Sequence, residues 1–317
     1  MFAHQVIDDI QGFIHGASRQ PHNNKLVDYI NALKWASCGI KQSQQFHIGD
    51  QADFYDSMGI SNYIKNKSKL FMGEDFAGAE LPYPKCWFDA RRHTSQKREL
   101  SGTYPSRKRG IYAEQIKKGL FFSVVFCHTE EFSKWIMSPF VHIIRMGEAL
   151  EIEGGITMDN GDVIGSSAGN MFVYPLFPDS ELGNKKYKLV REDADELTTI
   201  DLVMRLLNCK NIGTQKVNPS AKLNKVRIKR GKQPLFTYHI LVLKPTGKKQ
   251  ESISKNLWDN RIHLQRGHFK TYTEENPLFG NITGRFWWQP HVRGQNKNGI
   301  VMKDYVIAGP GERKNNA

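Results

Sequence analysis

The sequence predicts an α+β protein with a helical N-terminal part, a mixed central sheet and a basic, β-rich C-terminal module. Three observations favour this fold class. Apolar residues recur at helical spacing near the N-terminus, short apolar runs typical of strands fill the middle, and cationic residues concentrate in the last third. The 317 residues suffice for one large domain or two ordinary ones. We expect residues 1–200 to be a mixed α/β scaffold or partner-recognition region and residues 201–317 to be the basic module.

Two helices are predicted in the N-terminal part, at residues 4–16 and 25–38. Leu26, Ile30 and Leu33 of the second helix recur at helical spacing, which predicts one apolar face. A polar, proline-containing segment separates the two helices, because proline is unfavourable inside a helix.

The central part is predicted to hold strands followed by a third helix. Residues 81–90 and 119–128 are apolar runs of strand length, and Asp159–Asp162 has the composition of a tight turn between two short strands. Residues 91–110 are basic and polar, so we expect an exposed loop and a second phosphate contact there. Asp193 can cap a helix that ends at residue 208, with its apolar side chains on one face.

The C-terminal part begins with a predicted helix between Ser220 and Gly231, since a Pro-Ser pair favours a helix start and glycine a helix end. Three strands are predicted to follow, at residues 234–245, 285–293 and 300–307, and the segment 261–272 is treated as a strand that Gly267 could kink.

Charge is segregated along the chain. Residues 201–317 hold 22 Lys and Arg against 7 Asp and Glu, a net charge of +15, whereas residues 1–200 hold 23 against 25, a net charge of −2. A concentrated field of one sign attracts polyanions and speeds their encounter with the protein. Nucleic acid is therefore the expected partner of the basic module, although a merely solubilising surface is the plainer alternative.

The predicted strand at 285–293 has the composition of a nucleic-acid platform. Side chains alternate between the two faces of a strand, so one face holds the core-like Phe286, Trp288, Pro290 and Val292. The other face holds Arg285, Trp287, Gln289, His291 and Arg293. Tryptophan stacks on bases, Arg grips phosphates, and Gln and His read base edges or a 2′-hydroxyl. The alternative is an ordinary solvent-facing strand.

Further cationic side chains extend this candidate RNA-binding set. They are Arg261, Arg266 and Lys270 near the platform, and Lys225, Arg227, Lys229 and Arg230 on the predicted helix.

Three histidines in this region are candidate catalytic residues: His263, His268 and His291. One imidazole could take the 2′-hydroxyl proton of RNA while another protonates the leaving oxygen, with a cation stabilising the phosphorane. The alternative is that each histidine only bonds a backbone group and positions a loop. The spacing matches no metal-binding motif, and carboxylates are scarce in the module, so we expect no metal and no cofactor.

Other chemical classes are disfavoured. The sequence lacks the phosphate-binding glycine motifs of nucleotide-hydrolysing and dinucleotide enzymes. The four cysteines lie far apart without a C-x-x-C pair, which argues against a disulfide framework. The longest apolar run, around residues 119–127, is far shorter than the roughly 20 residues that span a bilayer, so we expect no membrane association.

The C-terminal part resembles a family of phage, prophage and plasmid proteins. The resemblance rests on the stretch His263–Gly294, where His263, Arg266, Gly267 and His268 form an H-x-x-R-G-H pattern followed by the W-Q-P of Trp288–Pro290. This pattern resembles one at the C-terminus of the type V-A anti-CRISPR protein that suppresses production of the effector nuclease. Where that protein has a tryptophan, this sequence has Phe269. The resemblance implies a mobile-element regulator in the host cytoplasm that acts on messenger RNA or translation.

Alternatives from other classes remain open. One is a metal-independent ribonuclease. A second is a protein-binding inhibitor whose basic surface docks on the ribosome, a nascent chain or a host protein. A third is a DNA-binding virion or packaging component, which should bind duplex DNA at least as well as single strands.

Overall fold

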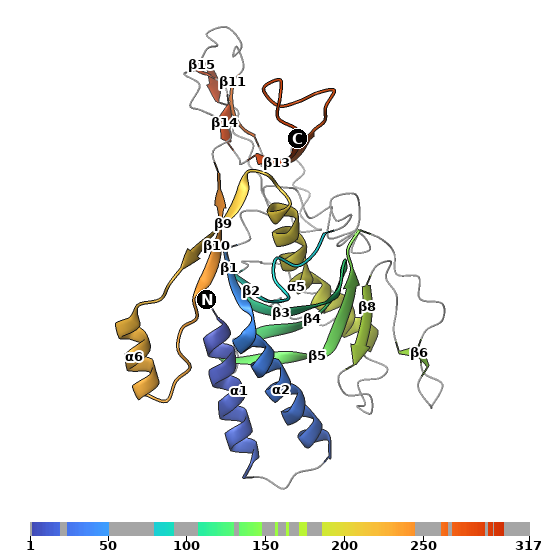
Figure 1. Ribbon diagram of the computed structural model, residues 1–317, viewed down its shortest axis with the longest axis vertical. Helices are drawn as coiled ribbons and strands as arrows, with labels where there is room; N and C mark the ends of the chain where they lie inside the picture. The colour runs from blue at the N-terminus through green and yellow to red at the C-terminus, as the bar shows by residue number, and fades with distance from the viewer. Residues whose placement is uncertain are drawn as a thin grey trace, which may run out of the picture.

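A computed structural model describes residues 2–19, 24–50, 79–91, 107–129, 133–147, 156–157, 163–164, 171–175, 186–244, 261–265, 268–288, 291–293 and 295–300. Within these ranges the fold is α+β, as the sequence predicts, with two helices at the N-terminus and strands across the rest (Figure 1).

The centre of the molecule is an eight-stranded mixed sheet with the order β8-β5-β4-β3-β2-β1-β10-β9. Its strands are β1 (Gln44–Asp50), β2 (Lys85–Arg91), β3 (Lys108–Lys117), β4 (Leu120–Thr129), β5 (Lys134–Arg145), β8 (Met171–Pro175), β9 (Ile212–Val217) and β10 (Tyr238–Leu243). Strand β1 runs parallel to both of its neighbours, β2 and β10, and the other neighbouring pairs are antiparallel.

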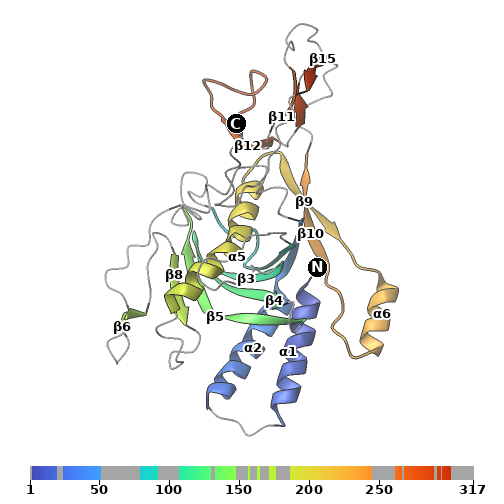
Figure 2. The ribbon, with the colours of Figure 1, turned by 180° about the vertical axis from the view of Figure 1, so that it is seen from behind.

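Helices cover the two faces of this sheet. The pair α1 (Ala3–Ala17) and α2 (Asn24–Gln42) packs on one face, and α5 (Lys186–Leu207) packs on the other, where Figure 2 shows it in front of the strands. Alternation along β2 sends neighbouring side chains into different layers. Trp87 lies in the core under α1 and α2, whereas Phe88 lies in the core under α5. The periodic apolar faces predicted from the sequence are thus the surfaces that pack on the sheet.

Two glycines permit close packing in the core under α1 and α2. A Cβ atom on Gly39 of α2 would lie 2.4 Å from the Tyr112 ring, and one on Gly110 would lie 2.2 Å from the Trp87 ring. Any larger residue would push an aromatic ring of the sheet away from its place.

A buried ion pair joins the sheet to α5. Arg109 of β3 and Glu196 of α5 approach to 3.7 Å, and both side chains are fully buried. Arg109 was expected in an exposed loop spanning residues 91–110. That expectation is wrong for Arg91 and for residues 108–110, which lie in β2 and β3, and residues 92–106 fall outside the described ranges.

The remaining strands form small sheets. Strands β6 (Ile156–Thr157) and β7 (Val163–Ile164) pair as the predicted hairpin, whose turn lies outside the described ranges. Strands β12 (His268–Tyr272) and β13 (Gly284–Trp288) form an antiparallel hairpin. Strands β11 (Arg261–Gln265), β14 (His291–Arg293) and β15 (Gln295–Ile300) form a separate three-stranded sheet.

Several sequence expectations are confirmed and others are corrected. The helices at 4–16 and 25–38 and the strand at 119–128 are present as α1, α2 and β4. The third helix is longer than predicted, because α5 begins at Lys186 rather than at Asp193. The boundary expected at residue 200 falls inside α5, and β9 and β10 beyond it pair into the central sheet. The predicted strand at 300–307 meets the described part of the chain only at Ile300.

No helix in the described ranges is long and apolar enough to cross a membrane.

Candidate nucleic-acid interface

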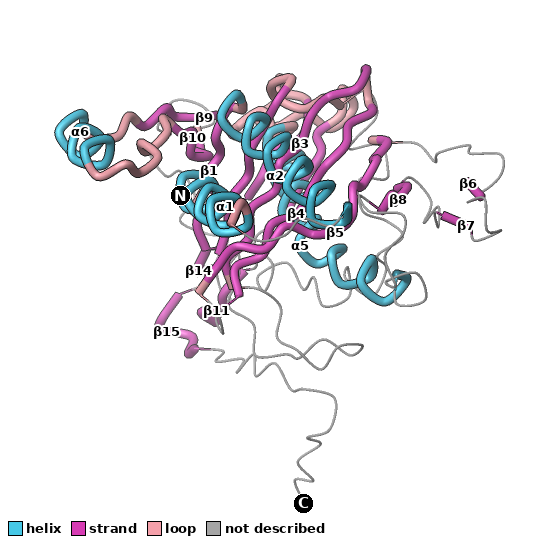
Figure 3. The backbone as a smooth tube through the Cα atoms, turned by 90° about the horizontal axis from the view of Figure 1, so that it is seen from below, coloured by secondary structure: helices cyan, strands magenta, loops and turns pink. Residues whose placement is uncertain are grey.

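The connection between β9 and β10 projects from the sheet as a basic arm, which we define as residues 218–237. Figure 3 shows its helix α6 (Ala221–Lys229) set apart from the strands. The helix forms where predicted: Ser220 occupies the N-cap position, and Gly231 adopts the left-handed φ of +66° just beyond the helix. None of the residues of α6 is buried. The exposed cationic side chains of the arm are Lys222, Lys225, Lys229, Arg230 and Lys232.

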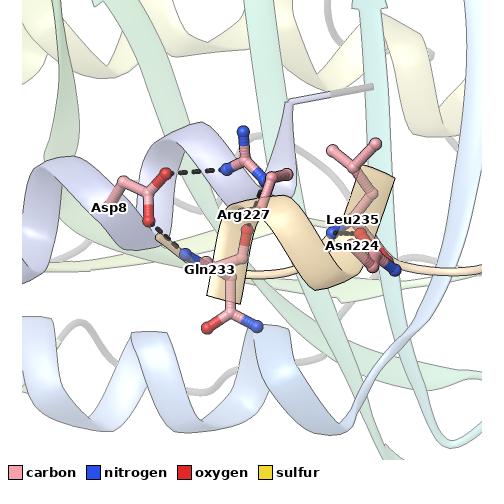
Figure 4. A network of polar contacts seen from close by, with 5 residues as sticks. All are labelled: Asp8, Asn224, Arg227, Gln233 and Leu235. Atoms are coloured by element: carbon pink, nitrogen blue, oxygen red, sulfur yellow. Dashed lines mark hydrogen bonds and ion pairs between the residues drawn. The ribbon is translucent and has the colours of Figure 1, made fainter. Parts of the chain in front are cut away.

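An aspartate of α1 anchors this arm. One carboxylate oxygen of Asp8, Oδ2, accepts a hydrogen bond from the Arg227 guanidinium at 2.9 Å, and the other, Oδ1, accepts one from the Gln233 backbone N–H at 2.7 Å (Figure 4). Arg227 also donates from Nε to the Gln233 carbonyl at 2.7 Å. Arg227 was predicted to bind nucleic acid, but its guanidinium is engaged inside the protein, where it ties α6 to α1.

A second pair of hydrogen bonds joins α6 to the segment of the arm that returns to the sheet. The Asn224 side-chain amide donates to the Leu235 carbonyl at 3.0 Å and accepts from the Leu235 N–H at 2.8 Å (Figure 4). These two bonds mimic the pairing of neighbouring strands and hold the helix against the returning segment. The exposed cations of the arm therefore stand on a fixed backbone.

Apolar side chains accompany these cations at the surface. Leu223, Val226 and Ile228 are 47%, 40% and 60% exposed, respectively. Apolar side chains grouped beside cations are typical of binding surfaces, so this composition favours a binding surface over a merely solubilising one.

The structure corrects the predicted tryptophan platform. Trp287 is only 2% exposed and packs with Leu202, Leu206 and Cys209, while its ring lies 4.7 Å from that of Phe269, centroid to centroid. It cannot stack on a base in this position. The prediction assigned Trp287 to the solvent face, but the end of α5 covers that face.

Polar bonds fix this hairpin to the body of the protein. The Asn211 side chain donates to the Trp287 carbonyl at 2.7 Å and accepts from the Trp287 N–H at 2.9 Å. Arg285 lies over the Phe269 ring at 4.7 Å, so its predicted phosphate contact competes with an internal cation–π contact. Lys270 is exposed and lies 4.7 Å from the Tyr272 ring, on the opposite face of the hairpin from Trp287.

The predicted catalytic histidines are distributed over two sheets. The backbone register places His263 opposite Arg293, and Gln265 opposite His291, in the sheet of β11 and β14. His268 pairs with Trp288 in the β12–β13 hairpin. The segment 261–272 and the strand predicted at 285–293 are therefore each divided between these two sheets.

The other predicted contacts are located as follows. Arg261 pairs with Gln295 of β15, and Arg266 and Gln289 lie outside the described ranges.

A polar constellation that the sequence interpretation missed lies at the start of α1. The buried carboxylate of Asp89 accepts hydrogen bonds from the Phe2 N–H at 2.7 Å and the Trp87 indole N–H at 3.2 Å. Its other oxygen is hydrogen-bonded to Nδ1 of His47, whose side chain is 27% exposed. The signal was an aspartate inside the apolar run Cys86–Ala90, because a buried carboxylate needs hydrogen-bond donors.

Within the described ranges, no group of three or more His, Cys, Asp or Glu side chains is arranged to hold a metal ion.

Comparison of the chain with protein-family models, curated proteins and solved structures finds no match.

Proposed function

We propose that this protein is an RNA-associated regulator of the phage or mobile-element type, acting on messenger RNA or its translation, and that the basic arm is its RNA-binding surface. The observation that carries the proposal is the set of five exposed cations on a helix and turn that Asp8 and Asn224 hold in place. A fixed set of cations binds phosphates with less loss of side-chain and loop entropy than a mobile one.

The spacing on α6 suits a strand of phosphates. Lys222, Lys225 and Lys229 are three and four residues apart, so they lie along one side of the helix. With a rise of about 1.5 Å per residue, they extend over about 10 Å of the axis. Each can bind a different phosphate of one polynucleotide.

The apolar side chains of the arm favour single-stranded RNA over a duplex. Unpaired bases expose faces and edges that Leu223, Val226 and Ile228 can contact. A duplex buries those faces in its stack and presents mainly phosphates to a short helix that lies outside its grooves. Messenger RNA, as the resemblance implies, supplies such unpaired segments.

The test is a triple substitution of Lys222, Lys225 and Lys229 by Gln. For single strands the logarithm of affinity changes by about 0.7 per phosphate contact for each tenfold change in salt. Loss of three contacts should therefore lower the salt slope by about 2, and affinity for single-stranded RNA by about 100-fold at 0.1 M salt.

The matched control replaces three exposed lysines elsewhere, Lys34, Lys41 and Lys117, by Gln, which removes the same charge. Affinity should be measured by fluorescence anisotropy with single-stranded RNA and with duplex DNA. An equal loss in both triple variants would reduce the arm to a contributor of general charge and contradict the proposal. Tighter binding of duplex DNA would favour the DNA-packaging alternative instead.

A further inference from the structure

The His47–Asp89 pair has the form of an oriented general base. A carboxylate only accepts hydrogen bonds, so the bond to Asp89 places the proton of a neutral His47 on Nδ1. The lone pair is then on Nε2, and 27% of the His47 side chain is exposed to solvent. Asp89 is itself fully buried and held by the Phe2 N–H and the Trp87 indole, so its orientation is fixed.

This pair lies at the base of the basic arm. Tyr238, the first residue of β10 after the arm, meets the His47 ring edge-on at 5.9 Å between centroids. Arg227 of the arm bonds Asp8 of α1, and Phe2 at the start of the same helix donates its N–H to Asp89. Helix α1 therefore connects the arm to the His47–Asp89 pair.

A cation completes the cluster. Arg91 is exposed and its guanidinium lies 5.6 Å from the centroid of the Phe2 ring, and that ring meets the His47 ring edge-on at 6.4 Å. His47, Asp89 and Arg91 share one face of the sheet near the carboxyl ends of the parallel strands β1 and β2. That end of a parallel pair is where open α/β sheets commonly bind ligands.

We propose that His47, oriented by Asp89, is the general base of an RNA-cleaving site that acts on single-stranded RNA held by the basic arm. The inference rests on the proposed function, because the arm supplies the substrate. It locates the chemistry at His47 rather than at the histidines of the C-terminal region.

The reaction is an internal transesterification. Nε2 of His47 takes the proton of a ribose 2′-hydroxyl, and the 2′-oxygen forms a bond to the adjacent phosphorus. The bond from phosphorus to the 5′-oxygen breaks, and that oxygen takes a proton from water. Arg91 stabilises the charge on the phosphorane, and the imidazolium returns its proton to solvent. The products are a 2′,3′-cyclic phosphate and a 5′-hydroxyl end.

The experiment compares the full-length protein with its His47→Gln variant on a labelled single-stranded RNA. Glutamine can still donate to Asp89 but cannot accept the proton, so cleavage should fall by about 10²-fold to 10⁴-fold while RNA affinity is unchanged. His15→Gln, which alters an exposed histidine of α1, is the matched control and should cleave normally. The all-deoxy strand should remain intact, because it lacks the nucleophile.

A second variant guards against misfolding. His47→Gly should lose cleavage, and added imidazoles should restore part of it in the order of their basicity, a dependence that a purely structural histidine would not show. RNA that the wild-type protein binds but leaves intact would overturn this inference and leave the proposed function standing. Undiminished cleavage by His47→Gln would overturn it as well. Cleavage that survives the triple lysine substitution with unchanged RNA affinity would instead overturn the role of the arm.

Discussion

Replacement of Asp8 by alanine should release the basic arm from the body of the protein. The substitution removes two hydrogen bonds, from Arg227 at 2.9 Å and from the Gln233 N–H at 2.7 Å. The side chains of the ion pair are 18% and 27% exposed, so water screens them in part. Hydrogen bonds to charged groups contribute about 1.5–3 kcal/mol each, whereas exposed ion pairs contribute about 0–1 kcal/mol. Because both side chains are partly exposed, we take about 1 kcal/mol for each of the two contacts. The total of about 2 kcal/mol corresponds to a roughly 30-fold larger open population.

Limited trypsin digestion measures that population. The exposed lysines and arginine of the arm, among them Lys225 and Lys229, are cleavage sites that a held backbone protects. When opening is fast compared with cleavage, the rate follows the open fraction, so Asp8→Ala should be cut in the arm about 30-fold faster. Asp28→Ala, which removes an exposed carboxylate from α2, should be cut at the wild-type rate. Equal rates in Asp8→Ala and wild type would refute the anchoring role.

Two further predictions concern the core. Trp287→Ala should lower the free energy of unfolding in urea by about 3–5 kcal/mol, because its buried ring fills the space beside Leu206; a loss below about 1 kcal/mol would mean that the ring is exposed in solution. Desolvation by burial lowers the pKa of His142 to about 4. In the folded state His142 therefore stays neutral down to about pH 4, whereas in the unfolded state it gains a proton below about pH 6.5. As the pH falls from about 6.5 to about 4, the free energy of unfolding therefore decreases by roughly 3 kcal/mol. His142→Leu should remove that part of the acid dependence, as followed by thermal unfolding across this range, and an unchanged profile would contradict the assignment.

Features that depend on neighbours in the sequence could be predicted from the sequence. Helices α1 and α2 follow from apolar spacing, β4 from an uninterrupted apolar run, and α6 from its Pro-Ser start and glycine end. The α+β class follows from these elements together. The start of α5 at Lys186 was not predicted, because Asp193 has the properties of an N-cap residue. Aspartate is also tolerated inside a helix, and tertiary packing can extend a helix beyond such a residue.

Features that depend on distant partners could not be predicted. Which side of β13 meets the end of α5 depends on Leu202 and Leu206, which pack with Trp287 although they are far from it in the sequence. Alternation fixes that Phe286 and Trp287 point in opposite directions, but it does not say which side α5 covers. The pairing of His47 with Asp89 likewise spans 42 residues and depends on the register of β1 against β2.

The charge segregation predicted a polyanion-binding region but not which cations serve it. Arg227 is paired with Asp8 of α1, which lies outside residues 201–317, so part of the cationic excess of that region stabilises the fold. The net charge of that region therefore overstates the charge presented to a ligand. Within the basic arm the two roles are separate. Its lysines are exposed, and Arg227 binds Asp8 of α1. One internal ion pair thus ties the helix of the arm to α1 while the lysines around it stay exposed, and this division of roles is the reason we propose the arm as the RNA-binding surface.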